Sequence, residues 1–276
     1  MKLHTLGGEP GDAAVLMLHG FGADRFSWLG TAPALAERAL VLAADLPSHG
    51  SAADERVTGF DSLVDDMIAG LEAEPAWQAA THRHVIGHSL GGALAIVVAA
   101  RSARPVQTLS VIAPVGLDGV TTPSSNPADS STRTSIDLAW LQQLIRLDDE
   151  ARAMTHLQQL VENPRLITRQ LPAMLVQHLA RQGVRDGLAA LVGDVPGIGA
   201  SIAADLASLA LPRTVIWGEA DRINRFDADA LARFGGESLV LPGCGHLPHI
   251  EQRVAVNEAL LSRLCTASAT AADERG

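Results

Sequence analysis

A serine between two glycines is the part of this sequence best suited to covalent chemistry. Val85-Ile86-Gly87-His88-Ser89-Leu90-Gly91 passes from an apolar run, through a Gly-x-Ser-x-Gly pattern, into an alanine-rich run. This order is typical of a strand, a tight turn and a helix, with the Ser89 hydroxyl standing clear of the sheet. Gly87 and Gly91 would lie close together in such a turn, where side chains would collide. The pattern predicts a nucleophilic serine.

A serine hydroxyl needs a base that accepts its proton, and that base needs an acid that orients it. Two downstream loops supply candidates, because each follows an apolar run and would open at the same sheet edge as the serine. We expect His246 to be the general base, with His249 as its rival, and Asp221 to be the acid. Two other acids remain open as alternatives: Glu219 and Asp118.

An oxyanion hole is expected beside the serine. His19-Gly20-Phe21-Gly22 ends the first buried run, and its glycines allow the backbone to approach a substrate closely. We expect the main-chain N–H groups of Phe21 and Leu90 to bind the oxyanion. The glycines expected to support these turns are Gly20, Gly87 and Gly91. His19 and His88 are expected to be structural.

The elements that must position these residues alternate between buried strands and helices. Helical patterns cover Arg25 to Arg38, Leu63 to Leu71 after a capping box at Thr58 to Asp61, Leu90 to Ser102, Ala228 to Phe234 and Glu251 to Leu264. The runs that predict strands are Ala13 to Leu18, Leu40 to Ala44, His84 to Gly87, Thr108 to Ala113, Thr214 to Trp217 and Ser238 to Leu241. The alternation indicates an α/β fold in which helices cover both faces of a mostly parallel sheet.

This rhythm is interrupted by a helical insertion. We assign 1–115 and 211–266 to the core, 116–210 to the insertion and 267–276 to a disordered tail. The insertion begins with a polar, poorly ordered segment from Pro123 to Ser131. Its expected helices are Ile136 to Leu147, Ala151 to Val161, Leu166 to Leu179 and Ser201 to Leu209. Because loops at strand ends build the site in such sheets, we expect the insertion to form a lid.

Composition excludes several other classes of protein. The 276 residues carry a net charge of −10, which argues against nucleic acid or an anionic membrane as partner. Lys2 is the only lysine, which argues against Schiff-base chemistry, Walker-type phosphate loops and lysine-linked prosthetic groups. Cys244 and Cys265 form no disulfide framework, and the histidines lack metal-ligand spacing. We therefore expect no cofactor.

Localisation follows from the apolar runs. Ala13 to Leu18 is too short for a signal peptide, and no run reaches the length of a membrane span. We expect a soluble, cytoplasmic enzyme with a small acyl substrate, and the oligomeric state stays open. The arginines of the insertion are expected to be solvated: Arg165, Arg169, Arg181 and Arg185.

These motifs together resemble the α/β-hydrolase superfamily over essentially the whole chain. The stretches Gly20 to Trp28, Asp45 to Gly50, Leu109 to Leu117 and Asn163 to Leu191 are similar to the hydrolase-like domain of acetoin dehydrogenase acetyltransferase (E2) components. Members of that group usually carry a lipoyl domain modified on a lysine, whereas this sequence has no lysine beyond Lys2. It also lacks the His-x-x-x-Asp-Gly motif of common dihydrolipoamide acyltransferases.

The motifs predict a serine hydrolase that cleaves a small carboxylic ester or thioester through an acyl-enzyme on Ser89. The resemblance implies acyl transfer to coenzyme A or lipoamide as an alternative. Two further alternatives are a C–C bond hydrolase and a non-catalytic ligand receptor on the same fold. An epoxide hydrolase or haloalkane dehalogenase is disfavoured, because the turn holds no aspartate.

Overall fold

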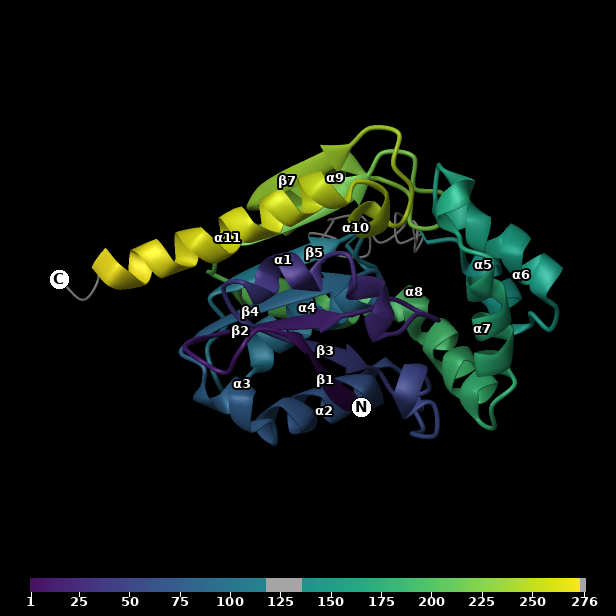
Figure 1. The fold of residues 1–276 in the computed structure, drawn as a ribbon, viewed down its shortest axis with the longest axis horizontal. Coiled ribbons are helices and arrows are strands. Elements are labelled where there is room, and N and C mark those ends of the chain that lie inside the picture. Colours follow the sequence, from purple (N-terminus) through teal and green to yellow (C-terminus); the bar gives the residue numbers. More distant parts are fainter. Residues whose placement is uncertain (118–135, 274–276) are drawn as a thin grey trace, which may run out of the picture.

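A seven-stranded sheet forms the centre of the computed structural model, which describes residues 1–117 and 136–273 (Figure 1). The strands lie in the order β1-β3-β2-β4-β5-β6-β7, and every neighbouring pair is parallel except β1 with β3. Their bounds are β1 Lys2–Gly7, β2 Ala13–Leu18, β3 Leu40–Asp45, β4 His82–His88, β5 Thr108–Ile112, β6 Arg213–Gly218 and β7 Glu237–Leu241. The predicted mostly parallel α/β sheet is confirmed.

The inner strands are confirmed at the runs where the sequence predicts them, and β1 is the strand that the sequence reading missed. β2 and β3 are almost entirely buried, as unbroken apolar runs require. β1 is half-buried at the sheet edge and mixes polar with apolar residues, so it gives only a weak apolar signal. It is held by antiparallel pairing to β3, from Lys2 opposite Asp45 onward.

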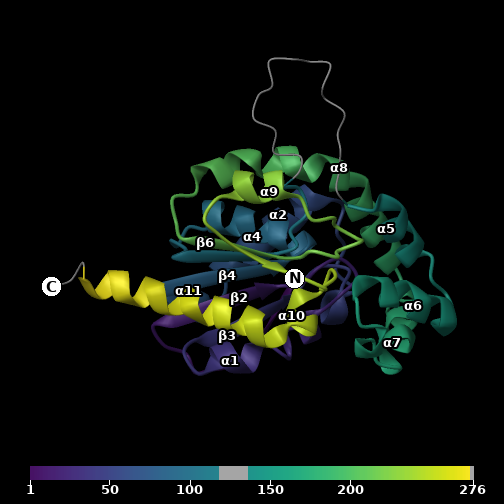
Figure 2. The ribbon, with the colours of Figure 1, turned by 90° about the horizontal axis from the view of Figure 1, so that it is seen from above.

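Helices cover both faces of the sheet (Figure 2). Side chains of β2 alternate between two apolar clusters, with Leu16 in one and Met17 in the other. The face that holds Met17 is covered by α1 (Ala32–Ala36) and α11 (Arg253–Asp273). The face that holds Leu16 is covered by α2 (Phe60–Glu72), α3 (Pro75–Ala79), α4 (Leu90–Arg101) and α9 (Ala228–Phe234). A short helix, α10 (Pro248–Glu251), and a 3-10 turn, η2 (Gly50–Ala52), border the carboxyl edge.

Two of the helices that cover the face holding Met17 differ from their expected bounds. The helix expected from Arg25 to Arg38 is a 3-10 turn, η1 (Arg25–Trp28), followed by the short α1, because Gly30 and Pro33 interrupt the pattern. At the other end of the chain, α11 continues to Asp273, past the expected end at Leu264 and through part of the expected disordered tail. The sequence there is rich in alanine, the best helix former.

The segment between β5 and β6 is helical where the structure describes it, from residue 136 onward. The expected polar segment Pro123 to Ser131 and the alternative acid Asp118 lie outside the described residues. The elements are α5 (Leu138–Ile145), α6 (Glu150–Leu157), η4 (Gln158–Leu160), η5 (Pro164–Leu166), α7 (Gln170–Leu179) and α8 (Val184–Ser208). In Figure 1, α5, α6 and α7 stand beyond the ends toward which the parallel strands point.

α8 begins much earlier than the helix expected from Ser201. Pro196 lies inside it, and a proline normally breaks a helix because it lacks an N–H group. Burial overrides this penalty, since the helix packs on α4 and α5 and buries Leu188, Leu191 and Ile198. By length and composition α8 is also apolar enough to cross a membrane, contrary to expectation, although 44% of that window is buried inside the protein. One such helix is weak evidence for a membrane span, because core helices pass the same test.

Candidate active site

Ser89 occupies a strained turn between β4 and α4. Its backbone has φ 53° and ψ −116°, a conformation that few residues other than glycine adopt. A side-chain carbon on Gly87 would collide with the Gly91 carbonyl, and one on Gly91 would collide with the Leu18 carbonyl. The Ser89 N–H donates to the Ile112 carbonyl at 2.9 Å, which anchors the turn to β5. The structure therefore has the strand, turn and helix that the glycine pattern predicts.

His246 and Asp221 meet at the ends of β7 and β6. His246 Nδ1 donates to Asp221 Oδ2 at 2.7 Å, and both side chains are buried. The other carboxylate oxygen, Oδ1, accepts the N–H groups of Ile223 and Asn224, each at 2.9 Å. Because a carboxylate only accepts, the proton of the imidazole lies on Nδ1, and Nε2 is left as a proton acceptor. The pair is thus arranged as a base with its orienting acid.

The competing residues are placed differently. The ring of His249 packs at 4.8 Å from both Trp28 and His88, and neither ring nitrogen has a hydrogen-bond partner within the described ranges. Burial, with a smaller effect of nearby His246, lowers the pKa of His249 to about 3, so it stays neutral. Glu219 is exposed to solvent. Among the acids weighed from the sequence, the structure places Asp221 against a histidine.

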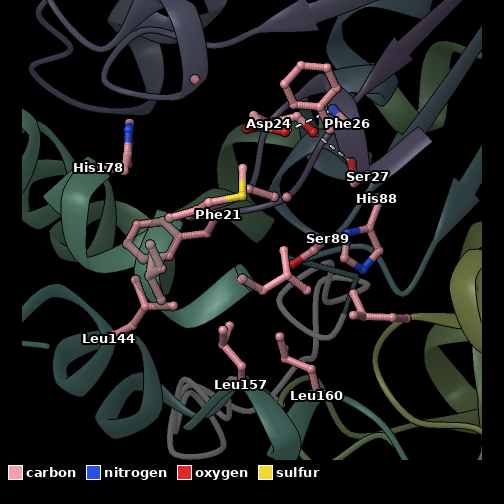
Figure 3. Close-up of a pocket in the computed structure, with 18 of the residues that line it drawn as sticks. Phe21, Asp24, Phe26, Ser27, His88, Ser89, Leu144, Leu157, Leu160 and His178 are labelled. Atoms are coloured by element: carbon pink, nitrogen blue, oxygen red, sulfur yellow. Dashed lines mark hydrogen bonds between the residues drawn. The ribbon is translucent and has the colours of Figure 1, made fainter. Parts of the chain in front are cut away.

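A cavity of about 660 Å³ opens beside Ser89 and His246, which both line it. Figure 3 shows Ser89 between Leu157 and Leu160 on one side and the loop with Asp24 on the other. The Ser89 and His246 side chains are not hydrogen bonded to each other in the described structure; such contacts often tighten only when substrate binds. The structure therefore brings the expected nucleophile and base to one cavity.

Two backbone N–H groups in the turns beside Ser89 have no acceptor among the described residues. Within residues 1–117 and 136–273, neither the Phe21 N–H nor the Leu90 N–H is hydrogen bonded. Leu90 is the first residue of α4, whose N-terminus carries a partial positive charge. The Gly20 backbone packs against the His88 ring, so a side-chain carbon on Gly20 would collide with that ring. N–H groups without an acceptor are the kind of donor that an oxyanion site uses.

His19 holds one of these groups in place, a role that the sequence reading did not assign. The Gly20 carbonyl accepts His19 Nδ1–H at 2.8 Å and the Ala23 N–H at 3.2 Å. Because the peptide is trans and planar, the Phe21 N–H points the opposite way. His19 Nε2 accepts the Leu46 N–H at 3.2 Å, and burial lowers the pKa of this histidine. Its position, directly before Gly-Phe-Gly, was the available signal.

His88 supports the loop that carries His246. Its Nε2–H donates to the His246 carbonyl at 2.8 Å, and the two rings are 4.8 Å apart. Burial, reinforced by His246 and then His249, lowers the pKa of His88 well below its ordinary value. A neutral His88 can pack against His246 without charge repulsion, in line with its expected structural role.

Glu251 is a second residue that the sequence reading missed. Its Oε1 accepts the Gly245 N–H at 2.6 Å, and its Oε2 accepts the Glu162 N–H at 2.8 Å and the Asn163 N–H at 3.4 Å. One carboxylate thus joins the loop before His246 to the segment between α6 and α7. The signal was an acid five residues after the histidine, but only coordinates reveal what it binds.

Cys244 lies beside this carboxylate. Its thiol is 3.8 Å from Glu251 Oε1, and the residue is fully buried. Burial and then the charge of Glu251 raise the pKa of the Cys244 thiol to about 12. The thiol therefore stays protonated at neutral pH and is no nucleophile.

The Asp45 carboxylate anchors the other side of the cavity. It accepts the Arg25 N–H and the Ser51 N–H, each at 2.8 Å, and forms an ion pair with the Arg25 guanidinium. Burial alone would raise the pKa of Asp45, but these hydrogen bonds lower it overall. Of the arginines named in the insertion, Arg181 lines the cavity and donates to the Gly50 carbonyl at 3.0 Å. Arg185 instead donates to carbonyls at the end of α5.

Metal ligands are not gathered in the part of the chain that the structure describes. No three histidine, cysteine or acidic side chains there are grouped so that they could hold a metal ion. The chemistry available at the cavity comes from the serine, the histidine with its acid and the two N–H groups.

A sequence model of the Alpha/beta hydrolase family matches residues 15–259, from β2 into α11. This chain belongs to the alpha/beta hydrolase family. The match spans both flanks of the sheet and the helical segment between them, so it includes every residue discussed at the cavity.

Relatives of this chain have names that describe different activities. It is 33% identical over 269 residues to the dihydrolipoyllysine-residue acetyltransferase component of the acetoin cleaving system of Pseudomonas putida, a match that spans 96% of this chain and 66% of that protein. It is 26% identical to monoacylglycerol lipase ABHD6 of Mus musculus, over 88% of this chain and 73% of that protein. The chain thus spans slightly less than two thirds of the Pseudomonas relative.

A solved structure confirms the fold. The crystal structure of the putative lipase lip1 from Acinetobacter baumannii superposes with a TM-score of 0.78, over 98% of this chain and 92% of that one. The two sequences are 19% identical, so the likeness concerns the fold alone.

Proposed function

We propose that this chain is a serine hydrolase that cleaves carboxylic esters or thioesters through an acyl-enzyme on Ser89. The hydrogen bond of 2.7 Å between His246 and Asp221, at a cavity that Ser89 also lines, carries the proposal. This arrangement gives the serine a base whose tautomer is fixed by an acid, the requirement for activating a hydroxyl.

The reaction proceeds in two steps. Ser89 Oγ attacks the acyl carbon, its proton passes to His246 Nε2, and the carbonyl oxygen becomes an oxyanion that accepts the N–H groups of Phe21 and Leu90. The bond to the alcohol or thiol breaks, and that group leaves with the proton from His246. Water then attacks the acyl-enzyme with the same base, which releases the acid and restores Ser89. Asp221 stabilises the imidazolium in both steps.

The helices between β5 and β6 are proposed as the lid of the site. α5, α6 and α7 supply cavity-lining side chains, which supports this role. A lid of this kind would decide which acyl groups reach Ser89.

The test is the Ser89→Ala variant, assayed with a short p-nitrophenyl ester and with a fluorophosphonate probe. We expect both hydrolysis and labelling to disappear while the circular dichroism spectrum is unchanged. Ser201→Ala is the matched control, because Ser201 sits in α8 in a similar Gly-Ala-Ser context and is exposed. Labelling that persists in Ser89→Ala would contradict the proposal, and binding without turnover by the unmodified protein would indicate a receptor.

Acyl transfer to a thiol is the second candidate, since the 33% identical relative is named as an acetyltransferase. It uses the same acyl-enzyme, with a thiol in place of water. Product analysis in the presence of coenzyme A or dihydrolipoamide distinguishes the two: a new thioester indicates transfer, and a free acid indicates hydrolysis.

A further inference from the structure

The cavity wall opposite the Asp24 loop is almost entirely aliphatic. Its side chains come from the helices between β5 and β6, and Figure 3 shows Leu144, Leu157 and Leu160 on that side of Ser89. Further residues of this wall are Leu141, Ile167 and Leu175. Trp140 of α5 also lines the cavity, and its indole N–H is the hydrogen-bonding group among these otherwise aliphatic side chains. A wall with so few hydrogen-bonding groups gains little from a polar ligand and favours one that buries hydrocarbon.

The mouth of the cavity is also apolar. Among the described residues, the exposed large apolar side chains are Phe26, Leu29, Leu171, Met174, Ile250 and Val254. Four of these line the cavity: Phe26, Leu171, Met174 and Ile250. Exposed apolar side chains that gather around one opening mark a ligand path rather than random surface. The apolar surface is thus continuous from beside Ser89 to solvent.

The other side of the cavity carries Phe26 together with most of the polar lining residues. Asp24 and Ser27 lie there, as Figure 3 shows. His178 near the end of α7 and Arg181 just after it donate to the carbonyls of Ser48 and Gly50, each at 3.0 Å. An amphiphile would therefore lie with its hydrocarbon on the leucine wall and its polar group toward these residues.

We propose that the acyl group delivered to Ser89 is an extended, unbranched hydrocarbon chain, and that the substrate is a medium- or long-chain acyl ester or thioester with a polar leaving group. This inference rests on the proposed function and names its substrate class. The volume of about 660 Å³ is far more than an acetyl group occupies and suits a flexible chain. An acyl chain on the leucine wall would run toward the exposed side chains of Leu171 and Met174.

The experiment compares p-nitrophenyl acetate, butyrate, octanoate and laurate, each below the concentration at which it forms micelles, with Ser89→Ala as the blank. We expect kcat/KM to rise about threefold per added methylene until the chain reaches the mouth, hence more than about a hundredfold from acetate to octanoate. The same order is expected with the corresponding coenzyme A thioesters.

Variants at the mouth of the cavity test where the acyl chain of the substrate binds. Leu171→Gln combined with Met174→Gln makes the mouth polar at exposed positions, where the fold tolerates the change. We expect this protein to lose about tenfold in kcat/KM for laurate and to keep its rate with acetate. Val254→Gln is the matched control, because Val254 is exposed and apolar but does not line the cavity. A third variant, Leu157→Trp, fills the leucine wall and should remove the preference for octanoate over acetate.

The outcomes separate this inference from the proposed function. A flat or falling series from acetate to laurate, with activity that still requires Ser89, overturns the acyl-chain inference and leaves the serine hydrolase intact. Equal losses with acetate and laurate in the Leu171/Met174 variant also overturn it. Absence of Ser89 labelling in any form of the protein overturns the function itself.

Discussion

The loops at the carboxyl edge of the sheet and the helical wall that faces them are built on different principles. At the edge, Asp221, His246 and Glu251 are each fixed by directional hydrogen bonds of 2.6 to 2.9 Å. On the wall, side chains such as Leu144 and Leu157 meet the cavity through packing alone. Directional bonds tolerate little displacement, whereas apolar packing accepts other side chains of similar volume. Under the proposed function, the edge would therefore set the reaction and the wall would select among substrates.

The carboxyl-edge loops and the helical wall are connected by hydrogen bonds around Leu160, Glu162 and Gly245. The His246 N–H donates to the Leu160 carbonyl at 2.8 Å, and Glu251 bonds to both sides of the same junction. A residue there can act on the reaction and on the wall together. Substitutions in the edge, at the junction and among the buried histidines test this contrast in decreasing order of effect.

The largest effect is expected at the edge, from Asp221→Asn. An amide can still accept the Ile223 N–H, but it does not hold the His246 tautomer or stabilise its imidazolium. We expect kcat to fall about a thousandfold with little change in KM, measured at saturating ester. Glu219→Gln is the matched control on the same loop and should be neutral, because Glu219 is exposed. A loss of less than tenfold in Asp221→Asn would break the contrast between edge and wall.

An intermediate effect is expected at the junction, from Glu251→Gln. The amide turns an NH₂ group toward backbone N–H donors and leaves at least one of them unpaired, at a cost of about 1–3 kcal/mol in the free energy of unfolding. We expect kcat to fall roughly tenfold for acetate and octanoate esters alike, because the His246 loop shifts.

The control for this variant is Glu258→Gln, an exposed acid on α11. Assays run well below the melting temperature separate lost activity from lost protein. If Glu251→Gln lowers the melting temperature but keeps kcat, the carboxylate only stabilises the fold, and edge and wall are mechanically independent.

The smallest effect concerns pH. Burial lowers the pKa of His249 to about 3, far below its ordinary value of 6.5. Below pH 6.5, His249 is therefore protonated in the unfolded chain but stays neutral in the folded chain. The free energy of unfolding is therefore unaffected by this histidine above pH 6.5 and decreases as the pH falls below it, by up to about 1.4 kcal/mol per pH unit. Urea unfolding between pH 6.5 and 4.5 should show that the free energy of unfolding changes less steeply with pH in His249→Phe than in the unmodified protein.

A histidine of the wall provides the comparison. Burial also lowers the pKa of His156, but a hydrogen bond to the Trp140 backbone and the charge of Asp137 oppose that shift. His156→Phe should therefore change the slope less than His249→Phe. An equal or larger change would show that acid sensitivity is not concentrated at the sheet edge.

The sheet could be predicted from the sequence because its inner strands are unbroken apolar runs. The same logic placed the Ser89 turn and its partners, since Asp221 and His246 each follow such a run at the carboxyl edge. Strand β1 was missed because polar and apolar residues are mixed along it, whereas β7 at the other edge of the sheet still carries the apolar run Leu239 to Leu241. The start of α8 escaped because Pro196 breaks the local pattern, whereas the burial that overrides it depends on α4, far away in sequence.

The supporting residues were harder to find for a related reason. Glu251 and His19 act through backbone groups, which leave no trace in residue types. The size of the cavity was equally hidden, because it depends on how α5, α6 and α7 stand over the sheet edge. The expectation of a small substrate came from the motif alone, and the apolar wall is what points to a longer chain.

The two cysteine thiols differ in their accessibility to labelling reagents. Cys244 is enclosed beside Glu251 with its thiol pKa raised to about 12, whereas Cys265 is exposed on α11. A maleimide dye at neutral pH will therefore attach at one position, remote from the cavity, without any engineered substitution. The native chain thus carries its own attachment point for fluorescence anisotropy, through which binding of an acyl ligand or a second copy can be followed.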